Sequence, residues 1–219
     1  MTLGVILLFF VVYTLWGTRL QTAQAQAELE TQFSAQVEPE VLTPDPDPAQ
    51  LYAQLQAEWD SVSASDGPIA RIQIPKIGVD SIVVAGTSRE ALKKGPGAFE
   101  TTSLPGAPGN SAISAHRTTY GAEFNRLNEL VPGDDIIVST VAGETVYKVG
   151  GTETVLPKDI EVTYQRGANE LTLTTCDPKF SAAKRLILYA SMASGPFLDT
   201  AAPPAQPGAR GGTSTGGGT

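Results

Sequence analysis

The sequence predicts a mainly β domain, arranged as a barrel or a sandwich, and three observations lead to this fold class. Between residues 69 and 192, short runs rich in β-branched residues are separated by Gly, Pro and Asn. Seven such runs follow one another at the close spacing typical of barrels and sandwiches. The folded part between the polar ends is about 130 residues long, an ordinary size for one domain.

The composition sets limits on the function. The chain has 219 residues, 41% of them hydrophobic, so it is long enough to bury one substantial core. Its net charge is −8 and its isoelectric point is near 4.7. Because affinity for phosphate backbones comes largely from clustered Lys and Arg, this charge and the lack of a long basic run argue against a nucleic-acid partner.

The chain contains one cysteine, Cys176, and one histidine, His116. This count excludes an internal disulfide and a structural zinc site built from His and Cys. In a protein outside the cytoplasm, a free thiol is either buried and inert or kept for its reactivity.

The N-terminal segment, residues 1–20, is expected to be a membrane anchor. An almost unbroken apolar run extends from Leu3 to Trp16 and is followed by Arg19. The run is shorter than the roughly 20 residues that span a bilayer, and no Lys or Arg precedes it. Either the chain starts downstream of its natural start, or the bilayer thins around the segment. A cleavable signal peptide is the alternative, with small residues for cleavage at Ala23, Ala25 and Ala27.

Residues 21–67 are expected to be an extracytoplasmic stalk. The part from Gln21 to Phe33 contains good helix formers. An extended, solvated stretch is expected next, since four prolines are interleaved with Asp: Pro39, Pro44, Pro46 and Pro48. Four residues then have the spacing of a short amphipathic helix: Leu51, Leu55, Glu58 and Trp59.

Residues 68–199 are expected to form the β domain, and residues 200–219, with almost no apolar side chains, a disordered tail. The predicted strands are residues 70–74, 81–85, 111–115, 136–140, 144–149, 171–176 and 185–191. Apolar residues at Phe124, Leu127 and Leu130, before a Pro-Gly pair, predict one helix over 122–130, and a shorter helical turn is expected around 89–92.

The strand that ends at Cys176 has two different faces. Because side chains alternate with period two, Leu171 and Leu173 lie on one face, and Thr172, Thr174 and Cys176 lie on the other. A thiol that only filled the core would be expected on the leucine face. The pattern therefore favours a thiol that reaches a cleft at the end of its strand.

His116 also lies where a strand gives way to a loop, and Arg185 begins the strand that follows Cys176. A lone histidine beside a loop is commonly a surface or hydrogen-bonded residue, and Arg185 is equally consistent with a solvated strand end. Lys179 and Lys184 offer alternative positive charges near the thiol. The three residues together indicate a nucleophile, an acid or base, and a cation.

The string Thr172-Leu173-Thr174-Thr175-Cys176 resembles the Thr-Leu-x-Thr-Cys signature of the sortases. Arg185 follows nine residues after the cysteine, and His116 ends a strand sixty residues before it. The resemblance covers most of residues 69–193. It includes the opening at Ile72–Val79 and the Gly-Asn-Ser entry to the histidine strand.

The context of the cysteine is most similar to class E sortases of high-GC Gram-positive bacteria. It comprises Cys176-Asp177-Pro178, Ser181-Ala182, Arg185-Leu186 and, just after the histidine, Tyr120.

This resemblance implies a closed eight-stranded β-barrel behind an N-terminal membrane segment, with His116, Cys176 and Arg185 as the catalytic triad. Cys176 would attack the threonine carbonyl of a Leu-Pro-x-Thr-Gly or Leu-Ala-x-Thr-Gly motif and form a thioester. Thr174, Thr175 and Tyr120 are the expected substrate-binding residues. Tyr120 resembles the class E tyrosine linked to a preference for alanine at the second motif position.

The resemblance also implies partners and a location. The substrates would be secreted proteins with a C-terminal sorting motif, and the acceptor would be the amine of a lipid-linked peptidoglycan precursor. The enzyme would be a single-pass protein of the cell membrane, with its catalytic domain on the extracytoplasmic face. No cofactor or metal is expected. Some sortases bind calcium through acidic loop residues, but Glu153, Asp159 and Glu161 are interpreted here as solvated charges.

Three alternatives remain. A pilin-polymerising sortase commonly carries a lid with an Asp-Pro-aromatic motif, whereas Asp45-Pro46 and Asp47-Pro48 are not followed by an aromatic residue. A membrane-anchored surface binding module would hold Cys176 as a packed core residue. A hydrolytic cysteine peptidase would use the same groups and transfer the acyl group to water.

Overall fold

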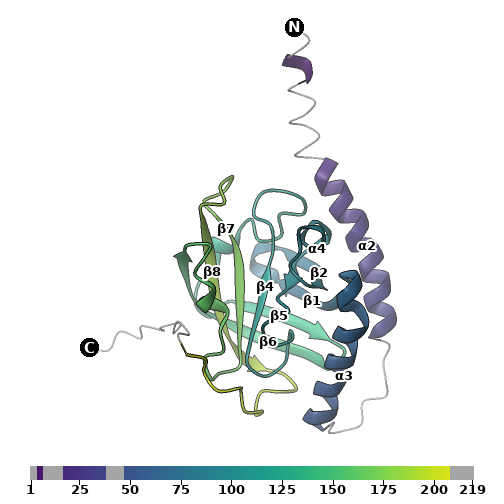
Figure 1. The fold of residues 1–219 in the computed structure, drawn as a ribbon, viewed down its shortest axis with the longest axis vertical. Helices are drawn as coiled ribbons and strands as arrows, with labels where there is room; N and C mark the ends of the chain where they lie inside the picture. The colour runs from purple at the N-terminus through teal and green to yellow at the C-terminus, as the bar shows by residue number, and fades with distance from the viewer. Residues whose placement is uncertain (1–3, 7–16, 38–46, 208–219) are drawn as a thin grey trace, which may run out of the picture.

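The computed structural model describes residues 4–6, 17–37 and 47–207, and its central element is a closed barrel of eight strands (Figure 1). Neighbouring strands follow the order β1-β2-β3-β4-β7-β8-β6-β5. The predicted eight-stranded barrel is therefore confirmed. The strands are β1 (Pro68–Ile74), β2 (Val79–Ala85), β3 (Gly97–Ala98), β4 (Asn110–Ser114), β5 (Asp135–Thr140), β6 (Gly143–Val155), β7 (Glu170–Asp177) and β8 (Lys184–Ser194).

The pairing of β7 with its two neighbours determines where His116, Cys176 and Arg185 lie. β4 runs parallel to β7, with Ser114 opposite Thr174. β8 runs antiparallel to β7 on its other side, with Arg185 opposite Cys176. Consequently the end of β4, the end of β7 and the start of β8 meet at one edge of the barrel.

The barrel interior is filled by apolar side chains from every long strand. Leu171 and Leu173 of β7 are fully buried there with Ile72, Val138 and Leu188. The alternation predicted for the strand before Cys176 is thus observed. Burying a side chain of this size contributes roughly 1.5–3 kcal/mol to stability, so the interior holds the strands in register.

One predicted helix is wrong. Within residues 122–130 the structure contains only a short 3₁₀ turn, η4 (Leu127–Glu129). Ala122 has a positive φ of 53°, which interrupts a right-handed helix before it starts. Phe124, Leu127 and Leu130 are buried and spaced three residues apart, a spacing that fits 3₁₀ turns as well as one face of an α-helix. The predicted turn near 89–92 is present as helix α4 (Arg89–Lys94).

The range interpreted as a stalk contains two helices. Helix α3 (Pro48–Val62) is capped by Asp47, whose carboxylate accepts a hydrogen bond from Ala49 N, and it buries Leu51 and Leu55 against Phe197. The Asp47-Pro48 pair therefore begins a helix. The other Asp-Pro pair, residues 45–46, lies outside the described residues.

Helix α2 (Thr18–Gln36) lies along the side of the barrel (Figure 1). Its Gln26 amide accepts a hydrogen bond from Ile82 N at 2.7 Å and donates one to Ile82 O at 3.0 Å. β3 pairs only with Val84 and Ala85 of β2. At Ile82 the Gln26 side chain therefore forms the hydrogen bonds that a neighbouring strand would otherwise form. Leu29 and Phe33 of the same helix are buried against the barrel. The helix formers predicted between Gln21 and Phe33 thus lie in a helix that packs on the barrel through Gln26, Leu29 and Phe33.

The start of α2 lies near the loop that follows β4. Thr22 donates a hydrogen bond to Lys93 O at 2.9 Å. A β-carbon placed on Gly121 would lie 3.0 Å from Thr22 Cγ2. The first turns of α2 are thus close to Tyr120, the neighbour of Gly121.

The structure describes the two ends of the chain only in part. Among the described residues, no helix has the length and apolar character needed to cross a bilayer. Residues 7–16, which carry most of the predicted membrane segment, are outside the described residues. The tail was predicted to be disordered from residue 200, but residues 200–206 lie against the barrel and form backbone hydrogen bonds with it.

Replacing Gln26 with Ala removes the partner of both Ile82 backbone groups. We expect Gln26→Ala to lower the free energy of unfolding by about 1–3 kcal/mol, the usual cost of leaving buried backbone groups unpaired. Urea denaturation measures this loss. Gln24→Ala, on the exposed side of the same helix, is the control and should stay within about 0.5 kcal/mol of the parent. Equal losses in both variants would contradict the docking role of Gln26.

Candidate active site

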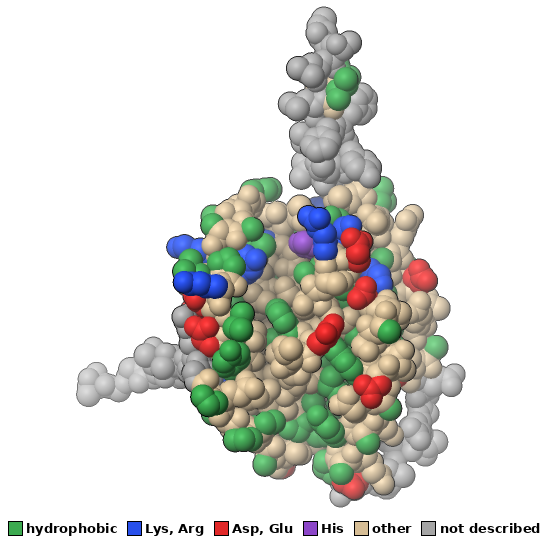
Figure 2. Space-filling model, in the orientation of Figure 1, with side chains coloured by type: hydrophobic (Ala, Val, Ile, Leu, Met, Phe, Trp, Pro, Cys, Tyr) green, Lys and Arg blue, Asp and Glu red, His purple; other side chains and the backbone are tan. Residues whose placement is uncertain are grey.

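A groove of about 620 Å³ lies on the outer face of β4, β7 and β8. Its far wall is the loop between β6 and β7. Figure 2 shows hydrophobic side chains around a hollow on this face, with Lys and Arg side chains and the histidine toward its upper end. The residues that line the groove include Phe99, Ser114, Leu156, Ile160, Thr174, Arg185, Gln206 and Pro207.

Cys176 lies on the same face of β7 as Thr174, at the end of the strand, and is partly exposed. It is directly opposite Arg185 of β8. The Cα atoms of such antiparallel partners are about 4.5–5.5 Å apart, and their side chains extend on the same face. Cys176 itself is not among the lining residues, but it lies beside Arg185, which lines the groove.

His116 is two residues beyond the last residue of β4. The parallel pairing continues past Ser114, because Ala115 N donates a hydrogen bond to Thr174 O at 3.2 Å. The Thr175 hydroxyl donates to Ala115 O at 2.8 Å. These two bonds hold His116 level with Cys176 on the neighbouring strand.

The imidazole of His116 is half-buried, and its ring centroid is 4.8 Å from the ring centroid of Tyr120. Its Nε2 atom is buried and has no hydrogen-bond partner in the described part of the chain. Burial lowers the pKa of His116 below its usual value of 6.5, because desolvation disfavours the charged imidazolium. This nitrogen is therefore covered by protein atoms, and no hydrogen bond within the described part of the chain restrains it.

Arg185 and the two nearby lysines have different positions. The Arg185 guanidinium lines the groove and donates hydrogen bonds to the carbonyl oxygens of Ala182 and Lys184 at 3.1 and 3.0 Å. Lys179 donates to Asn125 Oδ1 at 2.9 Å. Of the three positive side chains considered from the sequence, Arg185 is the one that both lines the groove and faces Cys176.

The three expected substrate-binding residues lie in different surroundings. Thr174 lines the groove. Tyr120, at a positive φ of 56°, packs beside His116 at the groove end. Thr175 is buried on the other face of β7, where its hydroxyl bonds to Ala115 O. Thr175 therefore links β7 to the chain just after β4 and does not line the groove.

Sequence reasoning missed Arg117, which joins the histidine loop to the cysteine strand. Its side chain is 6% exposed. Nη1 donates to Cys176 O at 3.1 Å and to Asp177 Oδ1 at 2.8 Å, and Nη2 donates to Asn128 Oδ1 at 2.9 Å. The signal in the sequence was weak: a charged residue three positions after the end of β4, whose burial requires partners that are distant in the chain.

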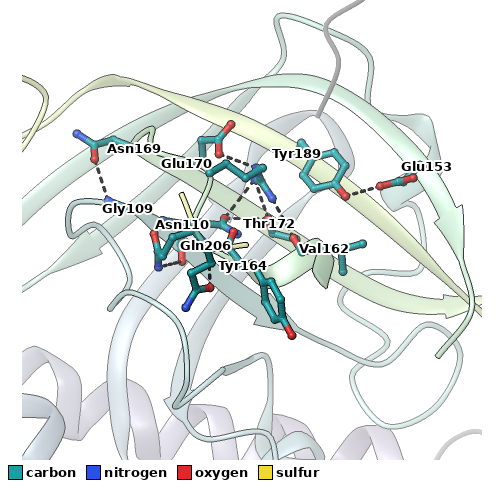
Figure 3. Close-up of polar contacts among 12 residues, drawn as sticks. Gly109, Asn110, Glu153, Val162, Tyr164, Asn169, Glu170, Thr172, Tyr189 and Gln206 are labelled. Carbon is teal, nitrogen blue, oxygen red and sulfur yellow. Dashed lines mark hydrogen bonds and ion pairs between the residues drawn. The ribbon is translucent and has the colours of Figure 1, made fainter. Parts of the chain in front are cut away.

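The acidic residues considered for calcium have protein partners. Glu153 accepts a hydrogen bond from the Tyr189 hydroxyl (Figure 3). The Asp159 carboxylate accepts one from Leu156 N at 2.9 Å. Within residues 4–6, 17–37 and 47–207, no group of three or more His, Cys, Asp or Glu side chains is arranged to hold a metal ion.

Comparison with known proteins identifies the family to which this geometry belongs. The family model of the sortase domain matches residues 72–193, more than half of the chain. The chain belongs to the sortase family. Members of this family are cysteine transpeptidases.

Individual sortases of class E are among the relatives. Sortase SrtE1 of Streptomyces coelicolor is 30% identical over 213 residues, covering 87% of this chain and 54% of the relative. Sortase SrtE2 of the same organism is 27% identical and covers 87% of this chain and 78% of the relative. The chain thus spans about half the length of SrtE1.

The solved structures include a crystal structure of sortase E1 from Streptomyces coelicolor with a tripeptide in the active site. It is 29% identical, with a TM-score of 0.55 over 58% of this chain and 88% of that one. Sortase E from Streptomyces avermitilis is 35% identical, with a TM-score of 0.53 over the same shares of the two chains. The sequence resemblance to class E sortases is confirmed by these relatives.

The Arg117 contacts predict a large effect on stability. We expect Arg117→Ala to lower the free energy of unfolding by about 3–5 kcal/mol, because Asp177 and Cys176 O lose a buried cationic partner. Arg126→Ala, in the same loop, removes an exposed pair with Glu129 and should cost about 1 kcal/mol or less. Thermal and urea unfolding of both variants test this difference, and similar losses would refute a buried clamp at Arg117.

Proposed function

We propose that this chain is a sorting-motif transpeptidase. It cleaves a Leu-Pro-x-Thr-Gly or Leu-Ala-x-Thr-Gly motif between Thr and Gly and transfers the protein to the amine of a lipid-linked peptidoglycan precursor. The observation that carries the proposal is the register of three adjacent strands. This register brings His116, Cys176 and Arg185 level with one another, beside the groove that Arg185 lines.

In the first half-reaction, the Cys176 thiolate attacks the threonine carbonyl carbon and forms a tetrahedral intermediate. The carbon–nitrogen bond then breaks, and His116 in its imidazolium form gives its proton to the departing glycine amine. A thioester remains on Cys176.

In the second half-reaction, the incoming amine attacks the thioester carbonyl and gives a proton to neutral His116. The carbon–sulfur bond breaks, the thiolate is restored, and a new amide joins the two molecules. Arg185 stabilises the oxyanion in both halves, because it is the residue opposite Cys176 on the neighbouring strand. To do so it exchanges its bonds to Ala182 O and Lys184 O for bonds to the substrate.

Substrate recognition is proposed to involve Thr174 in the groove wall and Tyr120 beside His116. Tyr120 narrows the groove end next to the imidazole, which favours alanine over the larger proline at the second motif position. Thr175 acts indirectly from the other face of β7, because its hydrogen bond to Ala115 O keeps His116 level with the thiol.

The proposed location is the extracytoplasmic face of the cell membrane, with residues 1–20 as a single-pass anchor. The support is the apolar run in the sequence and the sortase family itself. Both proposed partners, an exported protein and a lipid-linked precursor, are present at this surface.

Intact-mass analysis tests the reaction. The full chain is mixed with either motif peptide and a small amine, beside Cys176→Ala and Ser181→Ala. We expect a thioester adduct on Cys176 and an amine-linked product with the parent and with Ser181→Ala. Both species should be absent with Cys176→Ala. A product that carries water in place of the amine would indicate a hydrolytic peptidase, and an unmodified peptide would contradict the proposed function.

The pH dependence follows from the lowered pKa of His116. Neutral His116 is the form that accepts a proton when it acts as a base. As the pH falls, His116 becomes protonated with a midpoint below 6.5 and can no longer act as this base. We expect the acidic limb of kcat/KM to have its midpoint below pH 6.5. A pH profile with a motif peptide measures it, and a limb centred above 6.5 would refute a desolvated His116.

A further inference from the structure

The chain after β8 returns across the barrel and runs beside the groove. We call residues 200–207 the C-terminal strap. The Asn169 amide donates to Thr200 O at 2.8 Å, and a β-carbon placed on Gly109 would lie 2.9 Å from Pro203 Cδ. The strap therefore touches the turn before β4 and the end of the β6–β7 loop. Its last two residues, Gln206 and Pro207, line the groove.

Gln165 binds Gln206 of the strap through both its backbone carbonyl oxygen and its backbone N–H group. Gln206 N donates to Gln165 O at 2.8 Å, and Gln165 N donates to Gln206 Oε1 at 3.0 Å. The side chain of Gln165 accepts a hydrogen bond from Asn110 N at 2.7 Å and donates to Ser103 Oγ at 3.0 Å. Figure 3 shows Gln206 next to Asn110 and Tyr164 at this place. The end of the strap is thereby tied to the first residue of β4.

The loop that faces the strap is itself held firmly. The Arg166 side chain is 5% exposed, pairs with Glu170 at 2.7 Å and donates to Val162 O at 2.9 Å. Its guanidinium also lies 4.6 Å from the centroid of the Tyr189 ring. Because the loop is fixed to β7 and β8, the strap is bound to a rigid partner.

The strap lies at a definite distance from the thiol. Gln165 ties the strap to Asn110, which is opposite Glu170. Glu170 is six residues before Cys176. At about 3.3 Å per residue, this end of the strap is roughly 20 Å from the thiol along β7, a length that about six extended peptide residues span.

We propose that the C-terminal strap is a specificity-determining wall of the groove. It contacts the first residue of the sorting motif and the one or two residues that precede the motif. This inference rests on the proposed function, because the acylated threonine at Cys176 directs the earlier residues of the substrate toward the strap. Pro207 and the stem of Gln206 face a groove that Leu156 and Ile160 also line, so uncharged upstream residues fit best.

Two peptides test the strap. One begins at the motif leucine, and the other carries three uncharged residues before it. The full chain is compared with a variant that ends at Thr200, a control that ends at Pro207, and Gln206→Ala. Steady-state kinetics give kcat and KM for each peptide. The ratio of kcat/KM for the long peptide to that for the short peptide measures the upstream contacts.

We expect this ratio to fall about fivefold in the variant that ends at Thr200 and in Gln206→Ala, as for the loss of one hydrogen bond and its neighbouring contacts. The change should come from KM with kcat unchanged, since these contacts bind substrate and transition state equally. The control should keep the parental ratio. A variant that merely folds poorly would lose activity on both peptides equally and leave the ratio unchanged.

An unchanged ratio in both altered variants, with an active full chain, would overturn the role of the strap and leave the proposed function intact. A ratio that falls equally in the control would also overturn it, because residues 200–207 are present there. A full chain that cuts neither peptide would reject the proposed function and this role of the strap together.

Discussion

The parallel pairing of β4 with β7 is the constraint on which the candidate site depends. Parallel strands end at the same edge of a sheet, so residues at their ends meet although sixty positions separate them in the chain. The antiparallel partner β8 then adds a residue from its start at the same edge. Neither hydrogen bonds among the three candidate residues nor a bound ion is needed to explain their proximity. The buried interior of the barrel fixes the register, and the register fixes the site.

Two buried arginines fix the loops that border the groove. Arg117 joins the loop after β4 to the end of β7, and Arg166 joins the β6–β7 loop to the start of β7. Both guanidinium groups are almost completely buried and multiply hydrogen-bonded, which offsets the cost of removing a charge from water. The loops that border the groove are thus held at opposite ends of one strand. This arrangement explains how a rigid groove is formed by segments with little regular structure.

Much of the fold could be predicted from local patterns. Alternation identified the inner and outer faces of the strand before Cys176, and the family motif indicated the closed barrel. β3 was missed because a two-residue strand leaves no pattern, and its position depends on pairing with β2 and β4. The helix over 122–130 was wrong because a spacing of three suits 3₁₀ turns as well as a helical face. Arg117 and the strap escaped notice because their importance comes from partners that are distant in sequence.

The docking of α2 sets the end of the barrel at which the proposed membrane segment joins the domain. Thr22, in the first turns of the helix, lies beside Gly121 and Lys93, and Gly121 adjoins Tyr120 at the groove end. If the preceding residues insert into the bilayer as proposed, the chain leaves the lipid at the thiol end of the molecule. A client protein would then present its motif with the part after the cleavage site directed toward the lipid and its folded part directed away. Cleavage would release the client from whatever retains it in the membrane, at the surface where the lipid-linked amine is held.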